Sequence, residues 1–135
     1  MTGYTVRSAA VDAQTMLQAG DSLPDVWRHC VLQLLDVYES RLRRDGVDVA
    51  AATFATSPPS SGDARVDAAF AALAEHLARR DGWQPPVWSQ EPWRSTLDWW
   101  FVSELPGMHP WALRESPLSF RKRGVFIGER ALERV

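Results

Sequence analysis

Tryptophan is concentrated in one short stretch of this 135-residue chain. Six of its seven tryptophans fall between residues 83 and 111, and prolines stand between several of them. A tryptophan side chain buries about 150–250 Å² when it is covered, so this stretch needs a core or a partner to shield it from water. The prolines exclude a regular helix throughout residues 83–95. We therefore predict an ordered loop there, held in place by its own aromatic rings.

Three segments carry the apolar spacing of three and four residues that is typical of amphipathic helices. They cover residues 5–19, 22–45 and 64–81. Ser22 and Asp63 stand at N-cap positions, and a glycine follows each segment as a helix stop. The charged residues of the third segment, Asp67 and Glu75 among them, are expected on its solvent-exposed face.

The C-terminal third of the chain is predicted to be more irregular. The expected elements are a helix over residues 96–103, a helical turn after Pro110, a helix capped by Ser116 and ended by Gly124, either a short strand or a buried extended segment at residues 125–127, and a last helix through Leu132. Residues 56–62 form the best internal boundary, but each side is too short for an independent domain. We predict an all-α fold, in which residues 1–135 form a single domain of five to six helices around one core with at most one very short strand.

The charge of the chain is nearly balanced but uneven. The net charge of −2 gives no general attraction to nucleic acid or to an anionic membrane. Residues 112–135 hold six basic and three acidic side chains, so the C-terminal end is the main basic region. The single cysteine, Cys30, excludes an intrachain disulfide. Without a long apolar stretch or a signal-peptide core, we expect a cytoplasmic protein, and we expect no cofactor.

Catalytic and metal-binding motifs are missing from the sequence. It contains no glycine-rich phosphate loop, no GxSxG and no CxxC or HExxH pattern. His29 and Cys30 are adjacent, so on a helix their side chains point about 100° apart and are poorly placed to share a metal ion. Cys30 lies on an apolar helix stripe and is expected to be a buried, inert side chain. We therefore expect a protein that is not an enzyme and holds no metal.

Two stretches resemble a known group of proteins. Residues 67–88, DAAFAALAEHLARRDGWQPPVW, and residues 116–127, SPLSFRKRGVFI, are similar to parts of small uncharacterised helical proteins of high-GC bacteria. Some members of that group form the C-terminal part of longer chains that begin with a helix-turn-helix, and some are antitoxin-like by context. The resemblance implies a protein partner, such as a neighbouring toxin. Residues 1–62 show no basic recognition helix, so they do not support DNA binding by this chain itself.

Two segments stand out as possible contact surfaces. The aromatic and proline-rich residues 83–101 are typical of a stiff groove or a binding hot spot, although burial in the core is the simpler interpretation. The basic triplet at residues 121–123 lies between two apolar anchors and suits phosphate or acidic groups, although a solvated turn is the simpler interpretation. The residues predicted to contact a partner are Trp88, Trp93, Trp99, Arg121, Lys122 and Arg123.

These patterns predict a non-enzymatic protein-binding or regulatory protein, with an antitoxin-type protein as the leading example. Two alternatives stay open at this point. One is a nucleic-acid-binding transcriptional regulator. The other is a small ligand-binding protein with a pocket among the tryptophans, and the polar residues close enough in sequence to line it are Arg94, Asp98, Glu104 and His109.

Overall fold

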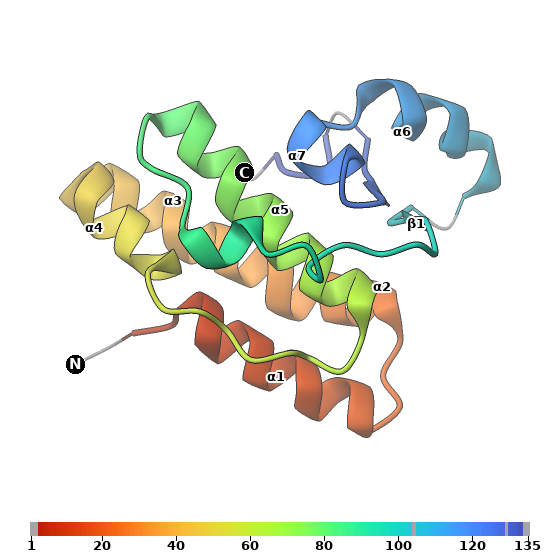
Figure 1. The fold of residues 1–135 in the computed structure, drawn as a ribbon, viewed down its shortest axis with the longest axis horizontal. Helices are drawn as coiled ribbons and strands as arrows, with labels where there is room; N and C mark the ends of the chain where they lie inside the picture. The colour runs from red at the N-terminus through yellow and green to blue at the C-terminus, as the bar shows by residue number, and fades with distance from the viewer. Residues whose placement is uncertain (1–2, 104, 129, 134–135) are drawn as a thin grey trace.

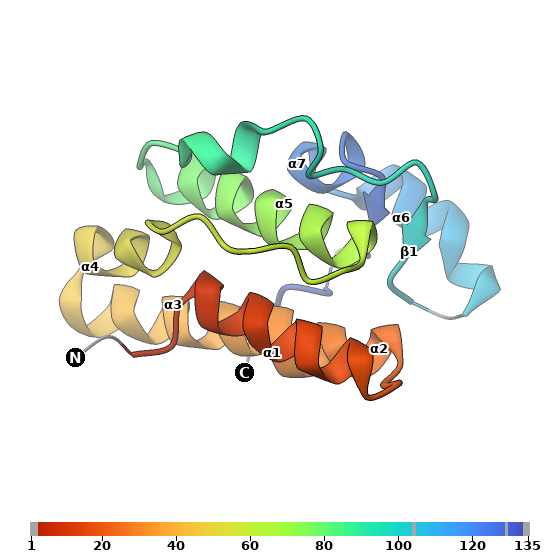
Figure 2. The same ribbon diagram turned by 60° about the horizontal axis from the view of Figure 1, so that its bottom comes forward.

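The computed structural model describes residues 3–103, 105–128 and 130–133. Helix α5 (Ala64–Asp81) lies in the middle of the molecule. Helices α1 (Val6–Gln18) and α3 (Gln33–Asp45) pack on one side of it, and the chain that follows α5 returns across the other side (Figures 1 and 2). The predicted all-α fold is confirmed, with a small two-stranded sheet as its only strand structure among the described residues.

Helix α5 is buried on nearly all sides. Every residue from Val66 to Ala78 except His76 is buried. Alanine occupies seven of its 18 positions, and these small side chains let neighbouring elements approach from several directions. The Asp63 carboxylate caps the helix by accepting a hydrogen bond from the backbone N–H of Arg65 at 2.8 Å. The predicted bounds and N-cap of this helix are confirmed.

The predicted solvent face of α5 is confirmed for Arg79 and Arg80, which are exposed, and wrong for its acidic residues. Asp67 and Glu75 are both buried. The Asp67 carboxylate accepts hydrogen bonds from the Ser60 hydroxyl at 2.7 Å and the Ser61 backbone N–H at 2.8 Å. Asp67 therefore fastens the 56–62 loop to the central helix, and buried residues on both sides of that loop belong to the same core.

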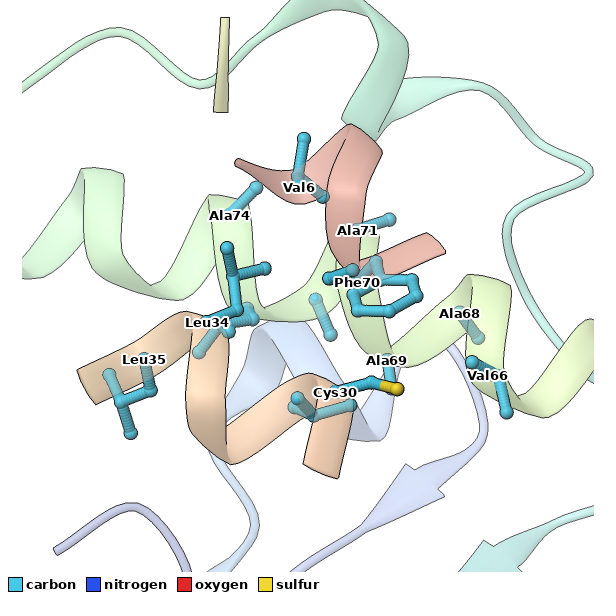
Figure 3. Close-up of a cluster of buried hydrophobic side chains, with 14 of the residues drawn as sticks. Val6, Cys30, Leu34, Leu35, Val66, Ala68, Ala69, Phe70, Ala71 and Ala74 are labelled. Carbon is cyan, nitrogen blue, oxygen red and sulfur yellow. The ribbon is translucent and has the colours of Figure 1, made fainter. Parts of the chain in front are cut away.

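The segment predicted as one helix over residues 22–45 is continuous but not uniform. It runs from α2 (Leu23–Val26) through the π-helical segment η1 (Trp27–Leu32) into α3, with Ser22 as its N-cap. Figure 3 shows Cys30 and Leu34 of this helix among buried side chains of α1 and α5. The predicted burial of Cys30 is confirmed, since none of its surface is exposed.

Short elements make up the rest of the chain. They are α4 (Val47–Ala51), η2 (Ala52–Phe54), η3 (Val87–Gln90), β1 (Trp100–Phe101), η4 (Pro106–Met108), α6 (His109–Glu115), α7 (Leu118–Arg121) and β2 (Val125–Phe126). Strands β1 and β2 are parallel, with Trp100 opposite Val125 and Phe101 opposite Phe126. Of the two alternatives for residues 125–127, the strand is the one that forms, at Val125 and Phe126. The expectation of at most one short strand is wrong, because β1 pairs with it.

Three local predictions in this part are wrong. Residues 96–103 are extended or bent rather than helical, because the Thr96 hydroxyl closes a turn with the backbone of Asp98 and β1 then pairs with β2. Ser116 does not cap α7; its hydroxyl donates to the Ala112 carbonyl and accepts from the Ile127 N–H. Residues 130–132 form turns rather than a last helix.

Candidate functional site

The tryptophan cluster is partly core and partly surface. Trp88 and Trp100 are buried and Trp83 is half-buried, whereas Trp93, Trp99 and Trp111 are exposed. The buried Trp88 ring donates from Nε1 to the Phe54 carbonyl oxygen at 2.9 Å. Some tryptophans of the cluster therefore belong to the core, and others lie on the surface where a partner could reach them.

The basic triplet is divided in the same way. Arg123 is only 6% exposed, Lys122 is exposed along part of its side chain, and Arg121 projects into solvent. Of the six predicted contact residues, Trp88 and Arg123 therefore point inward and make intramolecular contacts. Trp93, Trp99, Arg121 and Lys122 remain accessible to a partner.

The buried carboxylate of Glu75 organises a network of charges beneath this triplet. Its Oε1 accepts hydrogen bonds from Arg123 Nη1 at 2.8 Å and lies 2.7 Å from Lys122 Nζ. Its Oε2 accepts from Arg79 Nη2 and Gln90 Nε2, each at 3.1 Å. Four side chains from three segments of the chain thus converge on one carboxylate. Each of its two oxygens has two partners, as a buried charge requires.

Arg123 also holds backbone groups from two other elements. Its Nη1 donates to the Ser119 carbonyl oxygen in α7, and its Nη2 donates to the Ser89 carbonyl oxygen in η3, each at 2.7 Å. Through Glu75 it is joined to α5 as well. Arg123 is therefore a structural clamp between α5, η3 and α7.

The charge of Glu75 makes stability depend on pH. Burial raises the pKa of Glu75, but hydrogen bonds from Lys122 and Arg123 outweigh it and hold the pKa well below its usual range. A carboxyl whose pKa is lower in the folded than in the unfolded chain stabilises the fold above its unfolded pKa, and this stabilisation is lost as pH falls toward the folded pKa.

We expect the denaturation midpoint of the wild-type chain to fall between about pH 5 and about pH 2, more steeply than that of a Glu75→Gln variant. Guanidinium unfolding followed by tryptophan fluorescence measures both slopes. Other carboxyls with lowered pKa, Asp63 and Asp81, remain in both chains, so the difference isolates Glu75. Equal slopes would show that Glu75 is not held ionised by the network.

Arg94 is a second buried cation, only 2% exposed. Its guanidinium carbon lies 4.9 Å from the ring centroid of Trp88 and 4.0 Å from that of Trp93. Its Nε donates to the Glu91 carboxylate at 3.0 Å. Its Nη2 donates to the Ser57 hydroxyl at 3.1 Å and to the carbonyl oxygen of Pro58 at 3.0 Å. The third nitrogen, Nη1, is buried and finds no acceptor among the described residues.

A small cavity of about 200 Å³ lies between η3 and α7. The charged side chains that line it are Glu91, Arg94, Lys122 and Arg123. We call it the charged cavity. It brings the arginine that is packed against Trp88 and Trp93 to the same place as two members of the basic triplet.

A larger cavity of about 590 Å³ opens beside α4 and η2. Phe54, Trp83, Val87 and Trp88 supply its aromatic and apolar walls, and we call it the aromatic cavity. Both indole N–H groups are already used, because Trp83 donates to the Tyr38 hydroxyl at 2.8 Å and Trp88 to a carbonyl. Of the polar residues predicted to line a tryptophan pocket, Arg94, Asp98 and His109 do not line this one, and Glu104 lies outside the described residues.

Many of the exposed apolar residues come from one stretch, residues 97–118, although Trp100 within it is buried. Seven large apolar side chains of this stretch are exposed by 40% to 100%, and they are Leu97, Trp99, Leu105, Met108, Trp111, Leu113 and Leu118. We call these seven residues the apolar surface. The Trp99 ring contacts Phe126 at a tilt, with 4.9 Å between ring centroids, and is 61% exposed. In Figures 1 and 2 this stretch forms the end of the molecule that lies opposite α4.

The described residues offer little for catalysis. Among them no group of three or more histidine, cysteine or acidic side chains is arranged to hold a metal ion. Burial raises the pKa of the Cys30 thiol to about 11, so it stays protonated and is a poor nucleophile. His109 is stacked on Phe101 at 4.1 Å between ring centroids. Among the described residues, no helix has the length and apolar character needed to cross a membrane.

Two features of the site were not predicted from the sequence: the buried network around Glu75 and most of the apolar surface. Arg94 was predicted as a possible pocket residue, and it lines the charged cavity. For Glu75 a signal was present, because a helix that is apolar on all sides buries any charge it carries. No family model, curated protein or solved structure that was compared matches this chain. The resemblance to antitoxin-like helical proteins therefore stays a prediction, and function is argued from the geometry.

Proposed function

We propose that this chain is a non-enzymatic binding protein that docks another protein on its apolar surface. The observation that supports this is the exposure of seven large apolar side chains, by 40% to 100%, within residues 97–118. Large exposed apolar side chains that gather on one face are typical of a protein-interaction site, and we infer that these seven, which come from one stretch of the chain, do so. Tryptophans are enriched among residues that dominate binding energy, so we expect Trp99 and Trp111 to be the anchors.

The charges beside this surface indicate the chemistry of the partner. Arg114 and Arg121 are exposed, and the Arg114 guanidinium lies 6.0 Å from the ring centroid of Trp111. Asp98 and Glu115 are exposed beside the same side chains, so a partner with an apolar centre and a rim of both charges would match these features. The resemblance of residues 67–88 and 116–127 to antitoxin-like proteins supports a toxin as that partner.

Nucleic-acid binding is less well supported by the geometry. Of the basic triplet, Arg123 is committed to Glu75 and to two carbonyl groups, and Lys122 is paired with Glu75. Only Arg121 projects into solvent without a described ion-pair partner. Binding to nucleic acid requires several phosphate contacts, which this arrangement does not provide.

Small-ligand binding in the aromatic cavity is the second candidate. Its volume of about 590 Å³ lies in the range of ligand pockets. Such pockets orient their ligands with a few free polar groups, whereas here both indole N–H groups and the Ser57 hydroxyl already have partners, which leaves mainly the exposed amide of Gln84. The apolar surface therefore carries the better-supported proposal.

The proposal is tested with the full chain as bait in a native lysate. The retained protein is identified, purified and titrated against the bait by calorimetry. We expect a triple variant, Leu97→Glu/Trp99→Ser/Trp111→Ser, to bind at least about 100-fold more weakly, since two hot-spot residues contribute about 2 kcal/mol or more each. The matched control is Val11→Ser/Val49→Ser, which removes two apolar side chains, each 45% exposed, from α1 and α4; it should bind like wild type.

Three results would overturn this proposal. One is a partner that binds the triple variant as tightly as wild type. Another is a wild-type dimer that the triple variant converts to a monomer, because the surface would then be covered by a second copy. The third is co-sedimentation of the wild-type chain, but not the triple variant, with vesicles of anionic lipid.

A further inference from the structure

We infer that the charged cavity between η3 and α7 binds a phosphate group. The cavity shares no residue with the apolar surface, so this inference does not depend on the proposed function. It rests on three observations: a buried cationic donor without an acceptor, an excess of positive charge, and the size of the cavity.

The unpaired donor is Nη1 of Arg94. The side chain is 2% exposed, and its other two nitrogens are held by Glu91 and by the loop at Ser57. These bonds and the rings of Trp88 and Trp93 fix the guanidinium in place. A buried charged donor without an acceptor is costly. Arg94 lines the cavity, so we infer that an oxyanion bound there becomes the acceptor for Nη1.

Lys122 supplies a second donor to the same cavity. Its ammonium group lies 2.7 Å from Glu75 Oε1, and only one of its three N–H bonds is needed there. The side chain is exposed along part of its length, so an anion can reach it from solvent. Lys122 and Arg94 together offer two cationic donors, the arrangement that gives short, strong hydrogen bonds to phosphate oxygens.

The charge around the cavity favours a doubly charged anion. The charged groups that line it are three cations, Arg94, Lys122 and Arg123, and one carboxylate, Glu91. The Glu75 carboxylate beside them does not line the cavity and is paired with Arg79 as well. Two positive charges therefore remain unbalanced. A phosphate dianion would balance both, whereas a carboxylate would balance only one. The volume of about 200 Å³ suits a tetrahedral oxyanion and is too small to enclose a nucleoside.

Calorimetric titration with inorganic phosphate, at fixed ionic strength and near neutral pH, tests the inference. We expect saturable binding by wild type and about tenfold weaker binding by Lys122→Gln, because a charge-assisted hydrogen bond is lost. Glu91→Gln removes the competing carboxylate and should tighten binding several-fold. The matched control is Arg121→Gln, which removes a neighbouring exposed cation that does not line the cavity, and it should leave binding unchanged.

If Lys122→Gln weakens the fold, its loss of phosphate binding could have that cause. The tighter binding expected of Glu91→Gln could not, because a folding defect does not tighten binding. A parallel titration with glycerol phosphate distinguishes the source of the group: binding like that of inorganic phosphate assigns the site to phosphomonoesters, and weaker binding assigns it to free phosphate. No saturable heat with wild type would overturn the inference. So would equal binding of acetate, or phosphate binding that neither cavity variant alters.

Discussion

Replacing Glu75 by leucine is expected to lower the free energy of unfolding by about 3–5 kcal/mol, because removing one partner of a buried ion pair leaves the other charge buried without compensation. The stranded charge is that of Arg123, which is 6% exposed and faces Glu75 Oε1 at 2.8 Å. Arg79 and Lys122 are exposed members of the network, so water can hydrate their charges and the loss of Glu75 costs them little free energy. Guanidinium unfolding followed by circular dichroism measures the effect.

Two further variants separate this explanation from a simple packing defect. Adding Arg123→Met to Glu75→Leu should restore part of the lost stability, since a buried ion pair can often be replaced by apolar groups of similar size. Lys122→Met, which removes only a partly exposed member of the network, should cost about 1 kcal/mol or less. A double variant as unstable as the sum of its single variants would contradict the account of a coupled pair.

Replacing Gly124 by alanine is expected to cost about 3 kcal/mol, the second large effect. The residue has φ of +83°, which costs an L-residue about 1–2 kcal/mol. A Cβ at this position would also collide with the carbonyl oxygen of Thr96, which adds the cost of overpacking. That oxygen is hard to move, because the Thr96 N–H is bonded to the Arg123 carbonyl at 2.9 Å.

Gly82 provides the matched control for this prediction. It has nearly the same φ, +81°, and nothing lies within 4 Å of the position that its Cβ would occupy. Gly82→Ala should therefore show only the backbone cost of about 1–2 kcal/mol. Thermal and guanidinium unfolding of both variants give the comparison. Equal losses would show that the close approach of residue 124 to Thr96 adds no cost to the substitution.

The long helices could be predicted from the sequence because their signals are local. Apolar spacing, a polar N-cap and a following glycine fix α5 within its own residues. Residues 96–103 carry similar apolar residues, yet they are not helical, because Trp100 and Phe101 pair with a strand some 25 positions further along. A parallel pairing of two such short strands leaves no local pattern, so propensity alone favoured the wrong structure.

The candidate site could be predicted only in part. Three consecutive basic residues indicate a solvated turn, but successive side chains on a helical turn point about 100° apart. At the end of α7 this geometry sends Arg121 outward and Arg123 inward to Glu75. The tryptophans divide for a similar reason, since Trp88 packs against the 54–58 segment while Trp93 covers Arg94 from outside.

The most direct measurement of the central claim is hydrogen–deuterium exchange of this chain, alone and in complex with the partner captured from its native lysate. Backbone amides that a partner covers exchange more slowly, so the footprint of the partner can be read along the sequence. Docking on the apolar surface predicts that slower exchange is concentrated in residues 97–118 and extends to exposed residues near Arg121. Slower exchange confined to α1 and α3, or to the walls of the aromatic cavity, would contradict it.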